Sequence, residues 1–395
     1  IIVVSTDAVK TNGTVSETKK EVPETNPYEF LYDNSWFQFW IVILFGAIQS
    51  QFNSVLLMVA TYYIFEHTVF TCFWLAYGTY IYVDTSPYQG GYSYPLQVRV
   101  RKCFIWQSAA RYFPIVPHKT SPLLTGTHGT GTTPYAYVYV FGCYPHGMIG
   151  LGPSGTFGCD GSEFSSLFPG LRVNLAVLKF PLRLPFAREL FLASGCVDAS
   201  KSSIEWCLRH GRSVALLPGG AKEAMLLCSN SMEQNAHVRI LADRKGFIRL
   251  AVQNRASVVP VFTFGELEGY TDCSWIANTW AVKAFYDGVK KVTGFTPVIA
   301  CGPHWWYPFI PHRQQQDVVI GRPIPFDYNG NINSDSGELD GILTEKEALA
   351  RQVHRVHEKF LLDLHELYYA HRETYGYGKR ELVFQMKDGT IRKYP

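Results

Sequence analysis

A histidine in a turn is the residue of this chain best suited to acid–base chemistry. His146 follows an uncharged run of β-branched and aromatic residues, 135–142, which predicts a buried strand ending at Gly142. Active groups gather beyond the carboxyl ends of strands in open α/β sheets, and histidine is readily tuned to act as a base near neutral pH. A lone His-Gly pair in a loop is more often structural than catalytic. The residues around His146 must therefore decide which role it has.

Two further strand ends carry carboxylates. Residues 212–217 predict a strand, followed after a Pro-Gly-Gly turn by Glu223 on a new helix. Residues 256–264 predict another strand, and Glu266 lies just beyond its end. If these strands are parallel neighbours of the first, both carboxylates and His146 meet at one edge of the sheet. The expected fold is therefore α/β, with a mixed or mostly parallel sheet and flanking helices.

A basic segment follows the second carboxylate-bearing turn. Residues 243–251 predict a helix start that carries Arg244, Lys245 and Arg249. Helix N-termini and guanidinium groups both bind phosphate, so this segment suits a phosphate-bearing ligand. A solvated basic turn without a ligand is the alternative interpretation.

The C-terminal part predicts one long amphipathic helix. Thr344 and Glu347 form a capping-box pattern, and apolar residues spaced by three and four follow them. His354, His357 and His365 on this helix lack the H-E-x-x-H spacing. We expect these histidines to face water rather than to bind a metal.

Composition narrows the class of protein. Aromatic residues make up 15% of the 395 residues and charged residues only 17%, which suggests contact with something apolar. The net charge of +3 and the absence of a dense Lys/Arg run argue against nucleic-acid binding. Nine cysteines are scattered without a C-x-x-C pair, which argues against zinc and disulfide frameworks. Reduced thiols and a catalytic part facing the cytosol are the expectation.

The N-terminal part predicts a tail and a membrane hairpin. Residues 1–34 are polar and are expected to be a flexible tail. Residues 35–84 contain an uncharged run that is long enough to span a membrane, 36–64, and a second one that is short for a span, 68–83. Together they predict a transmembrane or re-entrant hairpin. Basic residues flank both outer sides, and the positive-inside rule puts both flanks in the cytosol. Residues 85–395 would then form a cytosol-facing catalytic domain, unless the two runs are core helices of a soluble protein.

Several common catalytic motifs are absent. The glycines after His146 have the wrong spacing for a dinucleotide loop, and neither a G-x-S-x-G elbow nor a Walker loop is present. A histidine base remains, without an obvious protein nucleophile but with carboxylates, basic residues and a membrane anchor. This combination fits direct transfer of an acyl group from a phosphate-bearing carrier to a lipid hydroxyl.

Six blocks in order resemble the diacylglycerol acyltransferase type 2 family. They are Tyr144-Pro145-His146-Gly147, Phe168-Pro169-Gly170, Arg188-Glu189 with Ser194-Gly195, Pro218-Gly219-Gly220 with Glu223, Arg244-Lys245-Gly246-Phe247, and Pro260 with Phe264-Gly265-Glu266. The resemblance implies a glycerolipid-acyltransferase-like fold on the endoplasmic reticulum membrane or lipid droplets, with transfer of a fatty acyl chain from acyl-CoA to diacylglycerol. Monoacylglycerol and wax-alcohol acyltransferases are close relatives of this family.

The resemblance also implies roles for particular residues. His146 would be the general base. The candidates for the carboxylate that orients it are Glu223 first, Glu189 second, and Glu266. The substrate-binding residues would be Tyr144, Pro145, Gly147, Gly219, Gly220, Arg244, Lys245, Arg249 and Glu266. Among these, the Gly147 turn would supply N–H groups for the oxyanion, and the basic residues would bind the phosphates of coenzyme A.

The sequence departs from related patterns at two positions. Tyr144 stands where animal members have histidine, as in fungal and algal relatives. Leu151 stands where the H-x4-D pattern of glycerolipid acyltransferases has aspartate, which counts against a lysophospholipid or glycerol-phosphate acyltransferase. The remaining alternatives are a monoacylglycerol or wax-alcohol acyltransferase and a catalytically silent lipid-binding scaffold.

The expected partners follow from this activity. They are acyl-CoA as a co-substrate, diacylglycerol and membrane lipid, with no metal, no bound cofactor and no nucleic acid. The oligomeric state, including a homo-oligomer, stays open.

Overall fold

The computed structural model describes most of the chain from residue 67 onward. The described residues are 38–40, 58–63, 67–128, 135–220, 222–224, 237–271, 279–293, 301–304, 310–329, 344–392 and 394. The predicted tail, 1–34, and most of the first arm of the predicted hairpin, 36–64, lie outside them.

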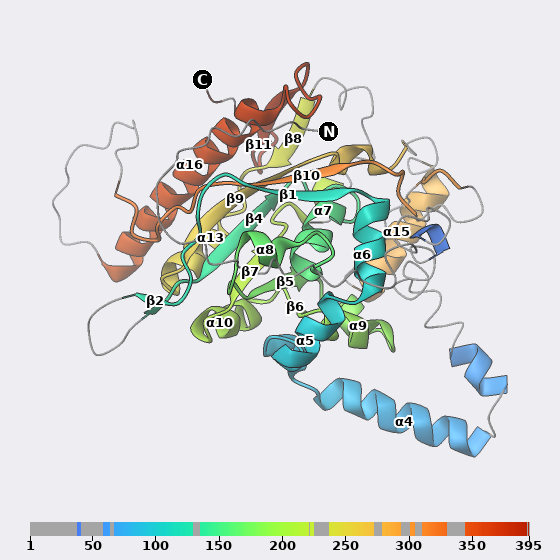
Figure 1. Ribbon diagram of the computed structural model, residues 1–395. Helices are drawn as coiled ribbons and strands as arrows, with labels where there is room; N and C mark the ends of the chain where they lie inside the picture. The colour runs from blue at the N-terminus through green and yellow to red at the C-terminus, as the bar shows by residue number, and fades with distance from the viewer. Residues whose placement is uncertain are drawn as a thin grey trace, which may run out of the picture.

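A seven-stranded sheet forms the centre of the molecule, in the order β1-β10-β9-β4-β7-β5-β6 (Figure 1). All neighbours pair in parallel except β10 and β9, which are antiparallel. The strands are β1 (Ile115–Lys119), β4 (Tyr139–Tyr144), β5 (Val173–Val177), β6 (Cys196–Asp198), β7 (Ser213–Leu216), β9 (Ser257–Phe264) and β10 (Gln316–Ile320). The predicted mixed, mostly parallel sheet is confirmed.

Two smaller sheets accompany it. β8 (His237–Leu241) pairs in parallel with β11 (Glu381–Gln385), which pairs with β12 (Ile391–Arg392). The third sheet joins β2 (Thr127–His128) to β3 (Tyr135–Ala136).

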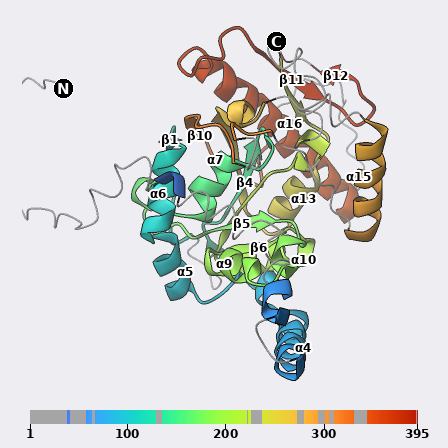
Figure 2. The same cartoon turned by 90° about the vertical axis from the view of Figure 1, so that its right-hand side faces the viewer.

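Helices cover both faces of the central sheet, as the two perpendicular views show (Figures 1 and 2). The α-helices are α4 (His67–Val83), α5 (Tyr94–Arg101), α6 (Phe104–Tyr112), α7 (Leu151–Pro153), α8 (Phe164–Leu167), α9 (Ala187–Ala193), α10 (Lys201–Arg209), α13 (Gly246–Gln253), α15 (Trp280–Thr293) and α16 (Glu345–His371). Short 3-10 turns are η1 (Ser86–Tyr88), η3 (Pro181–Arg183) and η4 (Glu266–Gly269), while η2 (Ser154–Gly158) is a π-helical turn.

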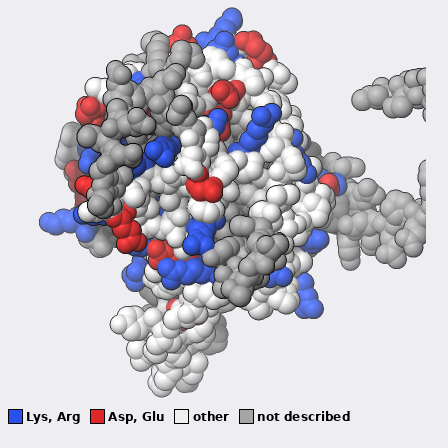
Figure 3. Space-filling model, turned by 90° about the vertical axis from the view of Figure 1, so that its left-hand side faces the viewer, with Lys and Arg blue, Asp and Glu red and all other residues white. Residues whose placement is uncertain are grey.

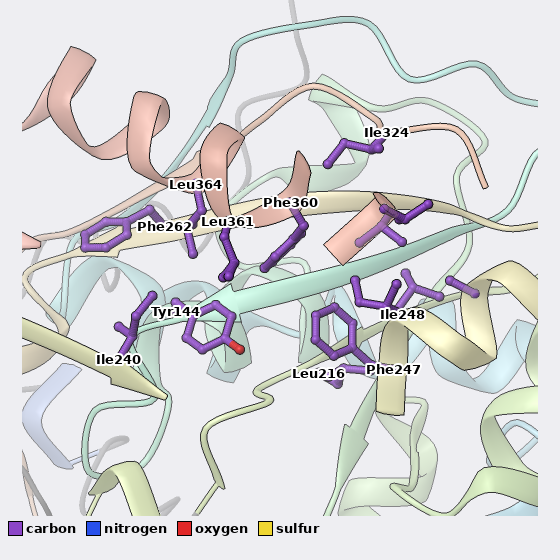
Figure 4. Packing of buried hydrophobic residues seen from close by; sticks show 14 of the residues in the cluster. Tyr144, Leu216, Ile240, Phe247, Ile248, Phe262, Ile324, Phe360, Leu361 and Leu364 are labelled. Carbon is purple, nitrogen blue, oxygen red and sulfur yellow. The ribbon is translucent and has the colours of Figure 1, made fainter. Parts of the chain in front are cut away.

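The central strand β4 separates two hydrophobic clusters. Val140 and Tyr144 face α13 and α16, where Phe247 and Phe360 pack (Figure 4). The alternate residues of β4 face the other cluster, which contains Phe157 of η2. A strand buried on both faces needs no polar alternation, which is why this segment has an uncharged sequence.

The predicted end of this strand, at Gly142, is wrong. β4 continues through Gly142 and pairs with β9 as far as Tyr144. A Cβ atom at position 142 would lie 2.8 Å from the Phe360 ring, so this glycine makes room for α16 instead of turning the chain. The first residues of the predicted strand, 135–136, form β3 in a separate sheet.

The C-terminal helix begins with the predicted capping box. The side chain of Thr344 accepts from the Glu347 N–H, and the Glu347 carboxylate accepts in return. The expectation that its histidines face water is wrong for His357, which is buried and lies 2.7 Å from the Ala242 carbonyl oxygen through Nε2. The apolar spacing shows which face of a helix packs, but it does not show a tertiary hydrogen bond that allows a histidine to join that face.

The second arm of the predicted hairpin forms α4. This helix of 17 residues contains no acidic or basic residue apart from His67, and none of its side chains is buried. It projects from the domain as a region without charged side chains (Figure 3). Within the described residues, no helix is both long and apolar enough to cross a membrane.

Candidate active site

His146 lies in the loop that follows β4, after a cis peptide bond between Tyr144 and Pro145. Its Nδ1 lies 3.0 Å from the Gly147 carbonyl oxygen. A carbonyl only accepts, so this contact places the proton on Nδ1 and leaves Nε2 as the acceptor nitrogen. Burial lowers the pKa of His146 below its usual value, which favours the neutral imidazole. The ring is therefore prepared to accept a proton through Nε2.

Glu223 contacts the same loop through the main chain. Its Oε1 accepts from the His146 backbone N–H at 2.5 Å, and its Oε2 accepts from the Leu241 N–H at 3.0 Å. Burial raises the pKa of this carboxyl to about 7, although both N–H groups oppose the shift. The structure thus brings Glu223 to the histidine loop as predicted, but its carboxylate binds backbone N–H groups and not the imidazole ring. The tautomer is set by the Gly147 carbonyl.

Glu266 holds the other end of the loop. Its two oxygens accept from the Leu151 and Gly152 N–H groups, both at 2.8 Å, where α7 begins. A Cβ atom at Gly147 would lie 2.5 Å from the Glu266 side chain, so the loop and the carboxylate are in close contact. Burial raises the pKa of Glu266 to about 7 as well. β7, β4 and β9 are parallel neighbours, and the predicted convergence at their carboxyl ends is confirmed for His146, Glu223 and Glu266.

Glu189 has its contacts elsewhere. Its Oε2 accepts from the Tyr77 hydroxyl at 2.6 Å, and its Oε1 lies 3.1 Å from Arg188. Arg188 is fully buried and also pairs with Asp84 at 2.5 Å. These contacts join α4 to α9. The partner of Glu189 is therefore Tyr77, a structural contact far in sequence from His146.

A cavity of about 1190 Å³ opens beside His146. Its wall combines residues that follow β4, β5, β6 and β7 with residues of α6, α9, η2 and α13, and apolar side chains predominate. Of the predicted substrate-binding residues, the wall includes Gly220, Arg244, Lys245 and Arg249. Tyr144 packs in the core beneath, and a Cβ atom at Gly219 would lie 2.1 Å from Glu223 Oε2.

The basic residues line the α13 side of this cavity. Arg244 and Arg249 are exposed and Lys245 is half-buried, with Lys245 directly before the first residue of α13. Cations beside a helix N-terminus can hold anionic oxygens, while the apolar wall of the same cavity suits a hydrocarbon chain.

Sequence reasoning missed the opposite wall of the cavity. Trp106 and Phe113 come from α6 or its end, Ser154 from the π-helical turn, and Cys159 and Cys196 from the interior. π-helical turns often occur at functional sites, but no sequence pattern of this chain announces one. The aromatic residues Trp106 and Phe113, close together in the sequence, are a signal for this part of the wall.

Metal ligands and thiols complete the inventory of chemical groups. Among the described residues, no cluster of three His, Cys, Asp or Glu side chains could hold a metal ion. Six cysteines in the described part of the chain are free, but Cys301 is disulfide-bonded. The expectation of reduced thiols is therefore wrong at Cys301, because a disulfide does not require a C-x-x-C pattern.

A buried histidine beside a large, mainly apolar cavity with basic residues on its wall fits the class of enzymes that act on an apolar substrate with an anionic group. The family model for diacylglycerol acyltransferase matches residues 62–385. A bovine (Bos taurus) 2-acylglycerol O-acyltransferase 1 is 31% identical over 79% of this chain and 85% of its own length. The chain belongs to the diacylglycerol acyltransferase family.

Other relatives carry different acceptor names. Human (Homo sapiens) acyl-CoA wax alcohol acyltransferase 1 is 28% identical over 81% of this chain and 90% of its own length. Bovine diacylglycerol O-acyltransferase 2 is 31% identical over 71% of this chain and 75% of its own length. No solved structure shows significant similarity to the chain.

Proposed function

We propose that this chain transfers a fatty acyl group from acyl-CoA to the free hydroxyl of diacylglycerol, with His146 as general base and without an acyl-enzyme. One observation carries the proposal. The imidazole is held with Nε2 as the acceptor nitrogen, and it lines a large apolar cavity that also has basic side chains. Membership of the diacylglycerol acyltransferase family supports the same reaction.

The transfer takes place in two stages. His146 Nε2 accepts the hydroxyl proton while the hydroxyl oxygen attacks the thioester carbonyl carbon. The resulting oxyanion is assigned to the N–H of Gly147, a position where the left-handed φ of 58° and the close Glu266 side chain both favour glycine. Collapse of the tetrahedral intermediate breaks the carbon–sulfur bond, and the imidazolium returns its proton to the departing thiolate of coenzyme A.

The phosphates of coenzyme A are assigned to Arg244, Lys245 and Arg249. Their position on the cavity wall would leave the apolar remainder to the acyl chain and the acceptor. Gly219 and Gly220 follow β7 at the same edge. Gly219 allows Glu223 to approach the turn closely, while Gly220 has a left-handed φ of 59°.

Two thiols on the cavity wall bear on the absence of an acyl-enzyme. Burial raises the pKa of Cys159 to about 11 and that of Cys196 to about 12. Both sulfurs remain protonated at neutral pH, and the thiol is a much weaker nucleophile than the thiolate. This supports direct attack by the acceptor hydroxyl.

The test is His146→Ala in purified protein, assayed with labelled acyl-CoA and diacylglycerol. Loss of a general base should lower the rate by about 10²–10⁴-fold. His210→Ala is the matched control, because this exposed histidine stacks on Trp206 in α10 and is not part of the cavity wall. Near-normal triacylglycerol formation by His146→Ala would exclude the base assignment.

A second candidate acceptor is monoacylglycerol or a long-chain alcohol. Relatives named for each of these acceptors are 28–31% identical to the chain, as close as those named for diacylglycerol. An assay that offers diacylglycerol, monoacylglycerol and a long-chain alcohol in competition separates them. Acyl-CoA binding without transfer to any of the three would indicate a silent scaffold.

The proposed site of action is the endoplasmic reticulum membrane, with the catalytic domain in the cytosol, or the surface of lipid droplets. The uncharged, unburied surface of α4 supports contact with lipid. Membrane fractionation of the full chain tests it, and recovery of the protein in the soluble fraction alone would oppose it.

A further inference from the structure

One buried carboxylate connects two parts of the cavity wall that are far apart in sequence. Glu223 is fully buried, and each of its oxygens accepts from a different backbone segment. Oε1 accepts from the His146 N–H at 2.5 Å and Oε2 from the Leu241 N–H at 3.0 Å. Leu241 ends β8, three residues before Arg244. One side chain therefore binds both the histidine loop and the last residue of β8, which leads directly into the basic turn 242–245.

The basic turn is held on its other side by the C-terminal part of the chain. The Ala242 N–H donates to the Gln385 carbonyl oxygen at 3.0 Å, and His357 Nε2 lies 2.7 Å from the Ala242 carbonyl oxygen. The Lys387 N–H donates to the Asp243 carboxylate. Both peptide groups next to Ala242 are thus hydrogen-bonded. Movement of the turn is therefore passed to Leu241, whose N–H donates to Glu223.

Glycine at position 219 permits this arrangement. A Cβ atom there would lie 2.1 Å from Glu223 Oε2 and 2.7 Å from Glu223 Cβ. Any other residue would displace the carboxylate from one or both N–H groups. The Pro-Gly-Gly turn therefore serves the position of Glu223.

We propose that Glu223 is a positioning residue that couples binding of the acyl-CoA phosphates at the basic turn to the placement of His146. The inference rests on the proposed function, since it takes the basic turn as the phosphate site and His146 as the base. Phosphates that bind Arg244 and Lys245 restrain the turn. The restraint reaches His146 through Leu241 N–H, the rigid carboxylate and His146 N–H, so donor binding orders the base.

Glu266 provides a matched comparison. It is a buried glutamate that also accepts two backbone N–H groups, from Leu151 and Gly152 at the start of α7, where the histidine loop ends. Neither group belongs to β8 or the basic turn, so Glu266 does not bridge the loop and the basic turn. Loss of either carboxylate loosens the loop, but only loss of Glu223 separates it from the turn.

A double-mutant cycle tests the coupling. Arg244→Gln should raise KM for acyl-CoA and lower kcat, each by about threefold to tenfold, which corresponds to about 1 kcal/mol. In a Glu223→Gln background, Arg244→Gln should still raise KM but should lower kcat no further. In a Glu266→Gln background, the two effects on kcat should multiply. Multiplication in both backgrounds would overturn the proposal.

Hydrogen exchange in the wild-type protein gives a second test that does not depend on a variant folding. Saturating coenzyme A should slow exchange in peptides that cover 241–245 and also in those that cover 145–148. Protection of 241–245 alone would overturn the coupling. Inactivity of His146→Ala together with uncoupled behaviour would reject this inference and leave the proposed function standing, while an active His146→Ala would reject the proposed function itself.

Discussion

The Tyr77 hydroxyl donates to Glu189 Oε2 at 2.6 Å, and this bond ties the second arm of the predicted hairpin to α9. The same hydroxyl accepts from the Phe186 N–H at 2.8 Å. α9 also places Leu190 and Phe191 on the cavity wall. The joint between α4 and the domain is thus continuous with the wall of the cavity, and Glu189 belongs to this joint.

Glu189→Gln should retain turnover. The glutamine amide oxygen can accept from Tyr77 as the carboxylate does, so the joint keeps its central bond. The contact of Glu189 with Arg188 is lost, but the Glu189 side chain is 34% exposed, so we expect kcat within about twofold of wild type. Initial rates at saturating acyl-CoA and diacylglycerol measure this. A hundredfold loss of kcat would show that Glu189 takes part in catalysis.

Arg188→Met should destabilise the protein. Arg188 is fully buried, pairs with Asp84 at 2.5 Å and Glu189 at 3.1 Å, and donates through Nε to the Leu182 carbonyl. Removing one member of a buried charged group leaves its partners uncompensated and costs about 3–5 kcal/mol. The thermal midpoint in detergent should fall by about 5 °C or more.

The exposed Arg183 is the control for this prediction. Arg183→Met should change the free energy of unfolding by no more than about 0.5 kcal/mol. Equal thermal midpoints for the two variants would show that the Asp84–Arg188 pair contributes little.

The sheet, and the edge of it that carries His146, Glu223 and Glu266, could be predicted because the sequence patterns that indicate them are local. β-Branched runs, each followed by a turn and a chemical group, predicted three strands that bring His146, Glu223 and Glu266 together if they are parallel neighbours. The pairing of β7, β4 and β9 meets that condition. Capping chemistry predicted the start of α16 in the same way.

The partners within the site could not be predicted, because they depend on tertiary distances. All three carboxylates were interpreted as groups that could orient the imidazole. Glu223 and Glu266 instead accept from backbone N–H groups, and Glu189 lies at the joint with α4. The orienting group is a backbone carbonyl, that of Gly147, and every residue has one, so no residue type marks it.

The pH dependence of stability should reveal Glu266. The pKa of this carboxyl is raised to about 7 in the fold, from an ordinary value of 4.5. Between these values the folded state binds a proton that the unfolded state does not, so the contribution of Glu266 to stability increases as pH falls and is lost as pH rises through about 7.

Glu266→Gln removes this proton uptake. The thermal midpoint of wild type minus that of Glu266→Gln should therefore increase as pH is lowered from about 8 to about 5. Calorimetry or fluorescence melts over this range measure the difference. A difference that is constant or decreases as pH falls would contradict the raised pKa.

Gly147→Ala should lower kcat by more than the backbone strain of alanine at this position alone would. Alanine pays a penalty of about 1 kcal/mol at a left-handed φ, here 58°, and its Cβ would also lie 2.5 Å from Glu266. The clash displaces the loop, so kcat should fall by about tenfold or more. Gly376→Ala is the control that also has a left-handed φ, of 78°, with no atom within 4 Å of its added Cβ, and it should leave kcat near wild type. Equal kcat values for both variants would refute the role of the Glu266 contact.

No covalent acyl-protein should accumulate when the acceptor is withheld. Cys159 and Cys196 line the cavity, but burial raises the pKa of both thiols to about 11 and about 12, so neither is a thiolate near neutral pH. Intact-protein mass spectrometry after incubation with acyl-CoA alone should show the unmodified mass. Adding diacylglycerol to the same sample should then yield triacylglycerol, which verifies that the protein is active. A hydroxylamine-sensitive mass increase that maps to either cysteine, and that disappears when diacylglycerol is added, would establish a thioester intermediate in place of direct transfer.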